Sequence, residues 1–292
     1  MIMRFYRVFI AALLGFAGLC FPAFAADMPT RVVTVGAPAT EIVFALGAGG
    51  TVVATDTTST WPEKVKTLPK VGYMRNLAAE GIISLKPDRV IAVAESGPMP
   101  VLDDLQALGI PVTILPSLAT FENLPDAIMV AATALGREDQ GQVLVHQVKA
   151  DIAAIEDLAD ANTARSKRKK IVFLMSVGHG QPMSAGAHTT ANEIIGLIGG
   201  ENPMAGYDGF KPVSPEIIAA DGADYVMVTS STLDQLGGLA GLQAHPVLGL
   251  HKAVAAGHVL TVSASTILGF GPRSAAEIRD LATQIHQYEV GH

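Results

Sequence analysis

The sequence predicts an α/β protein of two lobes that are joined by one long helix. Three observations predict it: apolar strands that alternate with helices, an internal repeat of that alternation, and one long amphipathic helix between the two copies. The 292 residues are enough for two lobes, each with a core of its own. Beyond the N-terminus no stretch is apolar for long enough to span a bilayer.

The first 25 residues have the pattern of a secretory signal peptide. Arg4 and Arg7 precede an apolar run, and a small-residue pattern ends at Ala25, after which we expect cleavage. Cys20 lies where a lipoprotein cysteine would, but the large Leu19 before it favours a soluble exported protein over a lipid-anchored one. The expected location is therefore the periplasm.

Removal of this leader leaves no cysteine, which excludes disulfides, zinc-thiolate sites and cysteine nucleophiles. The remaining chain has 18 basic and 27 acidic residues, a net charge of −9, so nucleic acid is not expected as a partner. We expect a monomer.

The internal repeat starts with a β-branched strand, a glycine and a helix that ends in glycines. The first copy covers residues 31–50 and the second covers residues 171–200. In a second pair of segments, a glutamate opens a short helix and an aspartate precedes a buried strand, with the same separation from Glu80 to Asp88 as from Glu216 to Asp224. Residues 111–115 and 258–262 add a strand to each lobe. Because the strands are continuously apolar, each is expected in a parallel sheet with helices on both faces, a Rossmann-like lobe.

One long helix is predicted between the copies, because apolar residues form a single stripe along residues 138–160. The expected division is an N-terminal lobe at 26–138, a linking helix at 139–167 and a C-terminal lobe at 168–292. Ligands of open α/β sheets bind beyond the carboxyl ends of the strands, so the loops after Val35 and Val177 should line a cleft between the lobes.

No motif of an enzyme is present. The chain lacks G-x-G-x-x-G, G-x-x-x-x-G-K-[ST], H-E-x-x-H and G-x-S-x-G, so we expect a protein that is not an enzyme.

Three motifs carry a resemblance to a known family: L68-P-K-V-G-Y-M-R75, A78-A-E-G-I-I-S-L-K-P-D88 and I267-L-G-F-G-P-R273. From about Arg31 to its end the chain resembles the periplasmic haem-binding proteins of bacterial ABC haem importers. These have the class III periplasmic binding protein fold, in which a helix links two lobes. The resemblance implies that the protein binds ferric haem b as transported cargo and delivers it to an inner-membrane ABC permease with its ATPase.

By this resemblance Tyr73 ligates the ferric iron through its phenolate, a hard anionic oxygen suited to Fe(III). An unperturbed phenol has a pKa of about 10, so the iron must favour the anion, and Arg75 either adds to this effect or pairs with a haem propionate. Met74 is expected to pack against the porphyrin. The alternative is that Tyr73 merely packs at the edge of a loop.

Three further residues have open roles. His179 follows a strand of the second copy and is a candidate second axial ligand, or the ligand of a second haem, whereas a histidine in a glycine turn is more often a surface residue. His188 is a weaker candidate. Arg273 either binds a propionate or caps a helix, and the role of Trp61 stays open.

Glu80 and Glu216 open equivalent helices, where a carboxylate is stabilised by the helix dipole. The resemblance implies in addition that each pairs with arginines of the permease and that the two charges orient the lobes on it. The rival ligands in the same fold are a ferric siderophore, cobalamin, or a bare metal ion, for which the sequence offers few clustered ligands.

Overall fold

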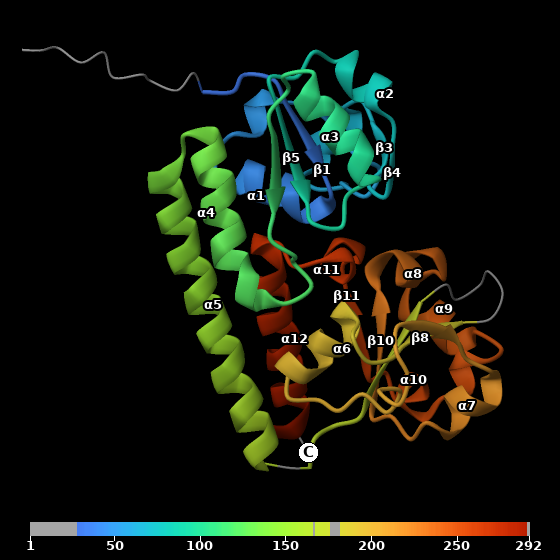
Figure 1. The fold of residues 1–292 in the computed structure, drawn as a ribbon. Helices are drawn as coiled ribbons and strands as arrows, with labels where there is room; N and C mark the ends of the chain where they lie inside the picture. Colours follow the sequence, from blue (N-terminus) through green and yellow to red (C-terminus); the bar gives the residue numbers. More distant parts are fainter. Residues whose placement is uncertain (1–27, 166, 176–181, 291–292) are drawn as a thin grey trace, which may run out of the picture.

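The computed structural model describes residues 28–165, 167–175 and 182–290, and it has the expected two-lobe α/β architecture (Figure 1). The long helix α5 (Glu138–Arg165) runs along both lobes. Helices α4 (Leu124–Leu135) and α12 (Pro272–Val290) pack beside it. Within these residues, no helix has the length and apolar character needed to cross a membrane.

The first lobe contains a four-stranded sheet in the order β2-β1-β5-β6, and every pair is parallel. Its strands are β1 (Val32–Val35), β2 (Val52–Thr55), β5 (Arg89–Val93) and β6 (Val112–Leu115). Its shorter helices are α1 (Ala37–Ala45), η1 (Gly49–Thr51), η2 (Glu63–Thr67), α2 (Ala79–Ile83), α3 (Met99–Ala107) and η3 (Phe121–Asn123). The repeat-based prediction of β1, α1, α2, β5 and β6 is therefore confirmed for this lobe.

A two-stranded hairpin, β3 (Gly72–Tyr73) and β4 (Asn76–Leu77), projects from the first lobe. Gly72 has a φ of +102°, a value that favours glycine. The hairpin is short, and isolated short hairpins are unstable, so its position depends on bonds to the lobe. Thr57 donates its backbone N–H to the Gly72 carbonyl at 2.9 Å.

The second lobe has a five-stranded sheet in the order β11-β10-β7-β8-β9. Strand β10 (Tyr225–Thr229) pairs in parallel with both β7 (Ile171–Met175) and β11 (Val259–Val262). Strand β8 (Met183–Ala185) pairs antiparallel with both β7 and β9 (Phe210–Pro212). The expectation of a purely parallel second sheet was wrong at this edge. Only seven residues separate β7 from β8 in the sequence, which is too few for the crossover of a dozen or more residues that a parallel pair needs.

The other elements of the second lobe are short helices. They are α6 (Thr190–Leu197), α7 (Pro215–Ala220), α8 (Ser230–Gln235), α9 (Gly238–Ala244), η4 (Leu248–Leu250), α10 (Lys252–Ala255) and α11 (Ala264–Leu268).

Both faces of the second sheet are buried. Along β7, Ile171 and Phe173 belong to a core that continues into the first lobe, while Val172 and Leu174 belong to a separate core on the opposite face. The predicted stripe of the linking helix is also confirmed: Val148 and Ile155 are fully buried, and Val145, Ile152 and Leu158 pack around them. One continuous core thus joins α5 to both lobes.

Candidate functional site

A cavity of about 830 Å³ lies where the two lobes face each other. Its first-lobe wall comes from the hairpin and from the segments after β5 and β6, and its second-lobe wall from β7, β8, β9, α6 and α11. The strand ends therefore line the cleft as parallel sheets require. The segment after β1 was also expected to line the cleft, but none of its residues is in the cavity lining. Gly36 is buried, and it donates its N–H to Asp56 inside the first lobe. Val177 lies outside the described residues.

Apolar side chains from both lobes form much of the cavity surface. Leu118 contributes from the first lobe, and Met175, Met183, Phe210, Ile267 and Leu268 contribute from the second. The volume falls within the range of small-molecule sites, which combine apolar walls with a few polar groups. This surface suits a ligand with a broad hydrophobic face.

The hairpin holds Arg75 at the first-lobe wall. Gly97 donates its N–H to the Met74 carbonyl at 2.9 Å and accepts the N–H of Leu77 at 3.0 Å, so the hairpin turn is fixed against the segment that follows β5. Arg75 and Glu95 both line the cavity, and Ser117 donates its hydroxyl to Glu95 Oε1 at 2.6 Å. The wall therefore carries both a cation and an oriented carboxylate.

Tyr73 is 43% exposed and immediately precedes the turn of the hairpin. The described residues that line the cavity include Arg75 but not Tyr73. Met74 points into the lobe: it is 3% exposed, belongs to the core, and its Sδ lies 4.0 Å from the Thr58 hydroxyl. A contact between Met74 and a ligand stays a prediction, and it would require the side chain to leave the core.

The second-lobe wall presents His188, whose Nδ1 lies 2.8 Å from Asp208 Oδ1. His188 has a φ of +55°, which is uncommon for a residue with a side chain and is often found at functional sites. An ionised carboxylate only accepts, so the neutral ring carries its proton on Nδ1 and leaves Nε2 as an acceptor. Nε2 has no partner within the described parts of the chain.

Next to His188, Thr189 caps helix α6 by accepting the N–H of Asn192 at 3.1 Å. His179, the stronger histidine candidate from the sequence, lies outside the described residues. Glu95 and Asp208 were not singled out. Glu95 had a usable signal, because it is polar and follows a buried strand, whereas Asp208 lies in an irregular segment without one.

Arg273 does not reach the cavity wall in this structure. Its Nη1 lies 3.5 Å from Glu41 Oε1, and its guanidinium lies over the Trp61 ring at 4.5 Å from the centroid. Burial raises the pKa of Glu41, and the charge of Arg273 opposes that rise. These contacts join α12 to the first lobe, so a ligand contact of Arg273 stays a prediction that requires it to leave Glu41.

Glu80 and Glu216 are both exposed and both lie in the first turn of a short helix, α2 and α7 respectively. Ser214 caps α7, and its hydrogen bond lowers the pKa of Glu216. Helix α2 has Ala78 at its N-cap position and therefore has no side-chain cap. The repeat thus places one carboxylate in the first turn of a short helix on each lobe, and the two helices differ in their caps.

Among the residues that the structure describes, no group of three or more histidine, cysteine or acidic side chains could hold a metal ion. A site for a bare metal would need such a convergence of ligands. The cleft offers instead an apolar surface with separate polar groups at Arg75, Glu95 and His188.

Comparison with known proteins gives the family. Residues 32–266 match the model of the family described as "Periplasmic binding protein". The apo structure of a periplasmic heme-binding protein, RhuT from Roseiflexus sp. RS-1, is similar over 89% of this chain and 98% of that chain, with 35% identity and a TM-score of 0.79.

Two curated relatives extend the comparison. An ABC transporter substrate-binding lipoprotein of Bacillus subtilis, YvrC, is 28% identical over 88% of this chain and 80% of its own. The vitamin B12-binding protein of Yersinia pestis is 33% identical over 67% of this chain and 66% of its own. The family is a non-enzymatic part of transporters, which agrees with the missing enzyme motifs. The chain belongs to the periplasmic binding protein family and is the substrate-binding component of an ABC importer.

Proposed function

We propose that the protein captures ferric haem in the cleft and delivers it to an ABC permease. The observation that carries this proposal is the cavity of about 830 Å³, which has apolar walls from both lobes and includes Arg75 of the Tyr73–Arg75 hairpin in its lining. A porphyrin needs a wide apolar surface and few polar anchors. The similarity to a periplasmic heme-binding protein supports the same ligand.

Tyr73 is the proposed iron ligand. Tyr73 is 43% exposed, and backbone hydrogen bonds fix the residues on either side of it, Gly72 to Thr57 and Met74 to Gly97. Its side chain can therefore turn toward a ligand while the backbone stays in place. Arg75 has the charge and the forked geometry to bind a propionate. His188 provides an imidazole on the opposite wall, and His179 remains the proposed second axial ligand.

Cobalamin is the second candidate, because a vitamin B12-binding protein is 33% identical over 67% of this chain. A titration separates the two. The purified protein is mixed in parallel with hemin, cyanocobalamin and ferrichrome, and visible absorbance and tryptophan fluorescence are recorded. A stoichiometric shift of the Soret band with hemin alone supports the proposal. Stoichiometric binding of cyanocobalamin without hemin binding would overturn it in favour of cobalamin, and ferrichrome binding would favour a siderophore.

Docking is proposed through Glu80 and Glu216. Both are exposed at the start of equivalent helices, one on each proposed lobe (residues 26–138 and 168–292). Two charges that are far apart define an orientation better than one, because a partner must match both at once. We also propose that the protein is a monomer, that the leader is cleaved after Ala25, and that the mature chain works in the periplasm.

A further inference from the structure

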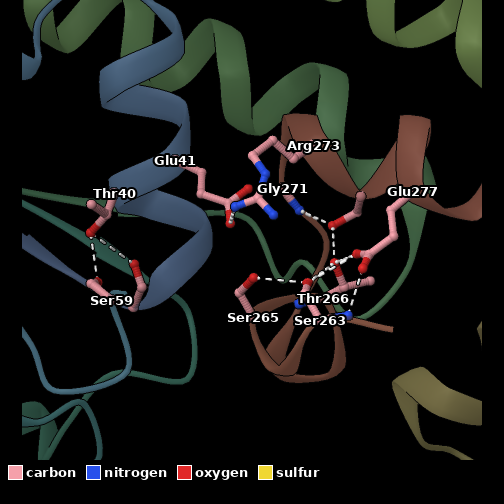
Figure 2. A network of polar contacts seen from close by, with 11 residues as sticks. Thr40, Glu41, Ser59, Ser263, Ser265, Thr266, Gly271, Arg273 and Glu277 are labelled. Carbon is pink, nitrogen blue, oxygen red and sulfur yellow. Dashed lines mark hydrogen bonds and ion pairs between the residues drawn. The ribbon is translucent and has the colours of Figure 1, made fainter. Parts of the chain in front are cut away.

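The two lobes meet at a second place besides the linking helix. We call it the interlobe joint and define it as Glu41, Trp61 and Phe121 of the first lobe with Phe270 and Arg273 of the second. Figure 2 shows Glu41 extending from α1 toward Gly271 and toward Arg273 at the start of α12. Its carboxylate is 3.5 Å from the Arg273 guanidinium, which also covers the Trp61 ring.

The joint is closely packed as well as charged. The rings of Phe121 and Phe270 stack with centroids 4.2 Å apart and planes inclined by 18°. Phe270 donates its N–H to the Leu118 carbonyl at 2.8 Å, a backbone bond between the lobes. At Gly271, an added Cβ would lie 2.6 Å from Glu41 Oε2, so the second-lobe chain passes directly over the carboxylate.

The joint is also continuous with the cleft. Leu118, which accepts the bond from Phe270, is itself part of the cavity wall. On the other side, Ile267 and Leu268 line the cavity shortly before Phe270 in the chain. A rotation at the joint therefore moves both walls of the cleft relative to each other.

Glu41 makes the joint depend on Arg273. Its side chain is only 5% exposed, and its Oε2 is buried without a hydrogen-bond partner in the described structure. Burial disfavours the charged carboxyl and is the largest cause of its raised pKa, whereas Arg273 and the Ser265 hydroxyl favour the charged form, and Glu277 disfavours it. Without the Arg273 guanidinium, this carboxyl keeps only the Ser265 hydroxyl and the backbone N–H at position 273 as favourable neighbours, so it must either take up a proton or reach water, and reaching water requires the joint to open.

We propose that Arg273 is a positioning residue: by neutralising Glu41 across the lobe boundary, it fixes the orientation of the two lobes and hence the width of the cleft. In this role Arg273 acts on the binding site through Glu41 and the orientation of the lobes, and not through a contact with the ligand. The inference rests on the proposed function only in its haem readout, since every contact that defines the joint is made between residues of the protein.

The direct test is a distance between the lobes. In a Cys20→Ser background the chain has no other cysteine, so spin labels can be placed at Asp103→Cys on α3 and Gln235→Cys on α8, both exposed. Pulsed electron paramagnetic resonance then gives the distribution of distances between the two labels. We expect a narrow distribution for the native joint and a broader or displaced one for Arg273→Met.

The decisive variant is Glu41→Gln combined with Arg273→Met. It removes the buried charge together with its partner, so the narrow distribution should return. Asp151→Asn is the matched control, because it breaks an ion pair of 2.8 Å between α5 and Arg279 of the same helix α12 and should leave the distribution unchanged. The proposal is overturned if Arg273→Met keeps the native distribution, or if the double variant is as displaced as the single one.

If Arg273→Met does not fold, the double variant still tests the proposal: it should fold with the native distribution, and failure to do so would overturn the inference. A second readout uses hemin. Arg273→Met should raise the hemin Kd about tenfold, a usual size for coupling through a conformational equilibrium, and the double variant should restore it. If the native protein does not bind hemin, the proposed function fails while the distance measurement still decides the role of Arg273.

Discussion

The two lobes share one design, and they differ where the site is built. The first lobe has a purely parallel sheet and carries the Tyr73–Arg75 hairpin as an addition, bonded to the segment after β5. The described residues of the second lobe form no such hairpin; its antiparallel strands β8 and β9 occupy one edge, and its cleft wall presents the His188–Asp208 pair. The strands and helices of the repeat thus form the frame of the cleft. The hairpin and the β8–β9 edge, which are not repeated, give the two walls different polar groups.

The lobes differ also in how their polar groups are held. The hairpin of the first lobe is fixed by backbone bonds, so Arg75 keeps a defined place even though its side chain is exposed. In the second lobe, the His188 and Asp208 side chains are 84% and 80% exposed and bond mainly to each other. We infer that the first lobe anchors the ligand and that the second lobe completes its cover.

The largest effect is expected from reversing one charge on each lobe. Glu80→Lys together with Glu216→Lys should abolish haem uptake by cells while the hemin Kd of the purified protein stays unchanged, because like charges at a docking surface cost several kcal/mol. Each single reversal should give an intermediate loss if the two lobes dock symmetrically. Normal uptake by the double variant would contradict docking through these residues.

Two glycines of the first lobe allow the stability of its parallel sheet to be compared with that of its hairpin. At Gly36 the φ is +95° and an added Cβ would lie 2.7 Å from Val93 Cγ2, so Gly36→Ala should lower the free energy of unfolding by about 2 to 4 kcal/mol. At Gly72 the φ is +102° but the nearest atom, Asn76 O, is 3.4 Å away, so Gly72→Ala should cost only about 1 to 2 kcal/mol.

Urea unfolding gives both values. Because Gly72 precedes Tyr73, its variant should weaken hemin binding more than its loss of stability suggests. Equal losses of stability at the two glycines would show that the hairpin is part of the frame.

Substitutions at the two cleft walls test which lobe anchors the ligand. Arg75→Met should raise the hemin Kd about tenfold, since a hydrogen bond to a charged group is lost, and Arg75→Lys should restore part of the affinity. His188→Ala should raise it about threefold, as expected for a neutral hydrogen bond. A larger loss at His188 than at Arg75, measured by absorbance titration, would reverse the assignment of the lobes.

The smallest effect concerns the two docking helices. The Ser214 hydrogen bond lowers the pKa of Glu216, so this carboxylate contributes stability above its ordinary pKa and loses it as the pH falls through the lowered value. Ser214→Ala should raise the Glu216 pKa toward its ordinary value, which a carbon-13 NMR titration can follow, and loss of the cap should cost about 1 kcal/mol.

The matched variant in the first lobe is Ala78→Ser. It adds the missing cap to α2 at a residue with extended backbone, and should therefore stabilise that helix. An unchanged Glu216 titration in Ser214→Ala would contradict the assigned cause.

The sequence was sufficient for the frame because strand and helix patterns are local. Apolar runs predicted β1, β5, β6, β7, β10 and β11, and one stripe predicted α5, whereas β2 was not predicted. The antiparallel edge was missed because β8 and β9 are only three residues each, too short to show a period. The joint was also missed, because Glu41 and Arg273 are far apart in the chain and no local pattern around either residue indicates that they form a pair.

The site was predicted in part. The hairpin motif led to Arg75, which does line the cavity, but nothing local indicates that Met74 points into the core or that Asp208 meets His188. Such contacts depend on how the loops pack in three dimensions.

The most direct test of the central claim is the visible spectrum of the hemin complex of Tyr73→Phe. Tyr207→Phe is its control, because that phenol belongs to the second lobe and donates to the Ser184 carbonyl at 3.1 Å. We predict that the native protein and Tyr207→Phe show the charge-transfer band of a phenolate bound to ferric haem and that Tyr73→Phe loses it. The same band in Tyr73→Phe would contradict ligation of the iron by the first lobe.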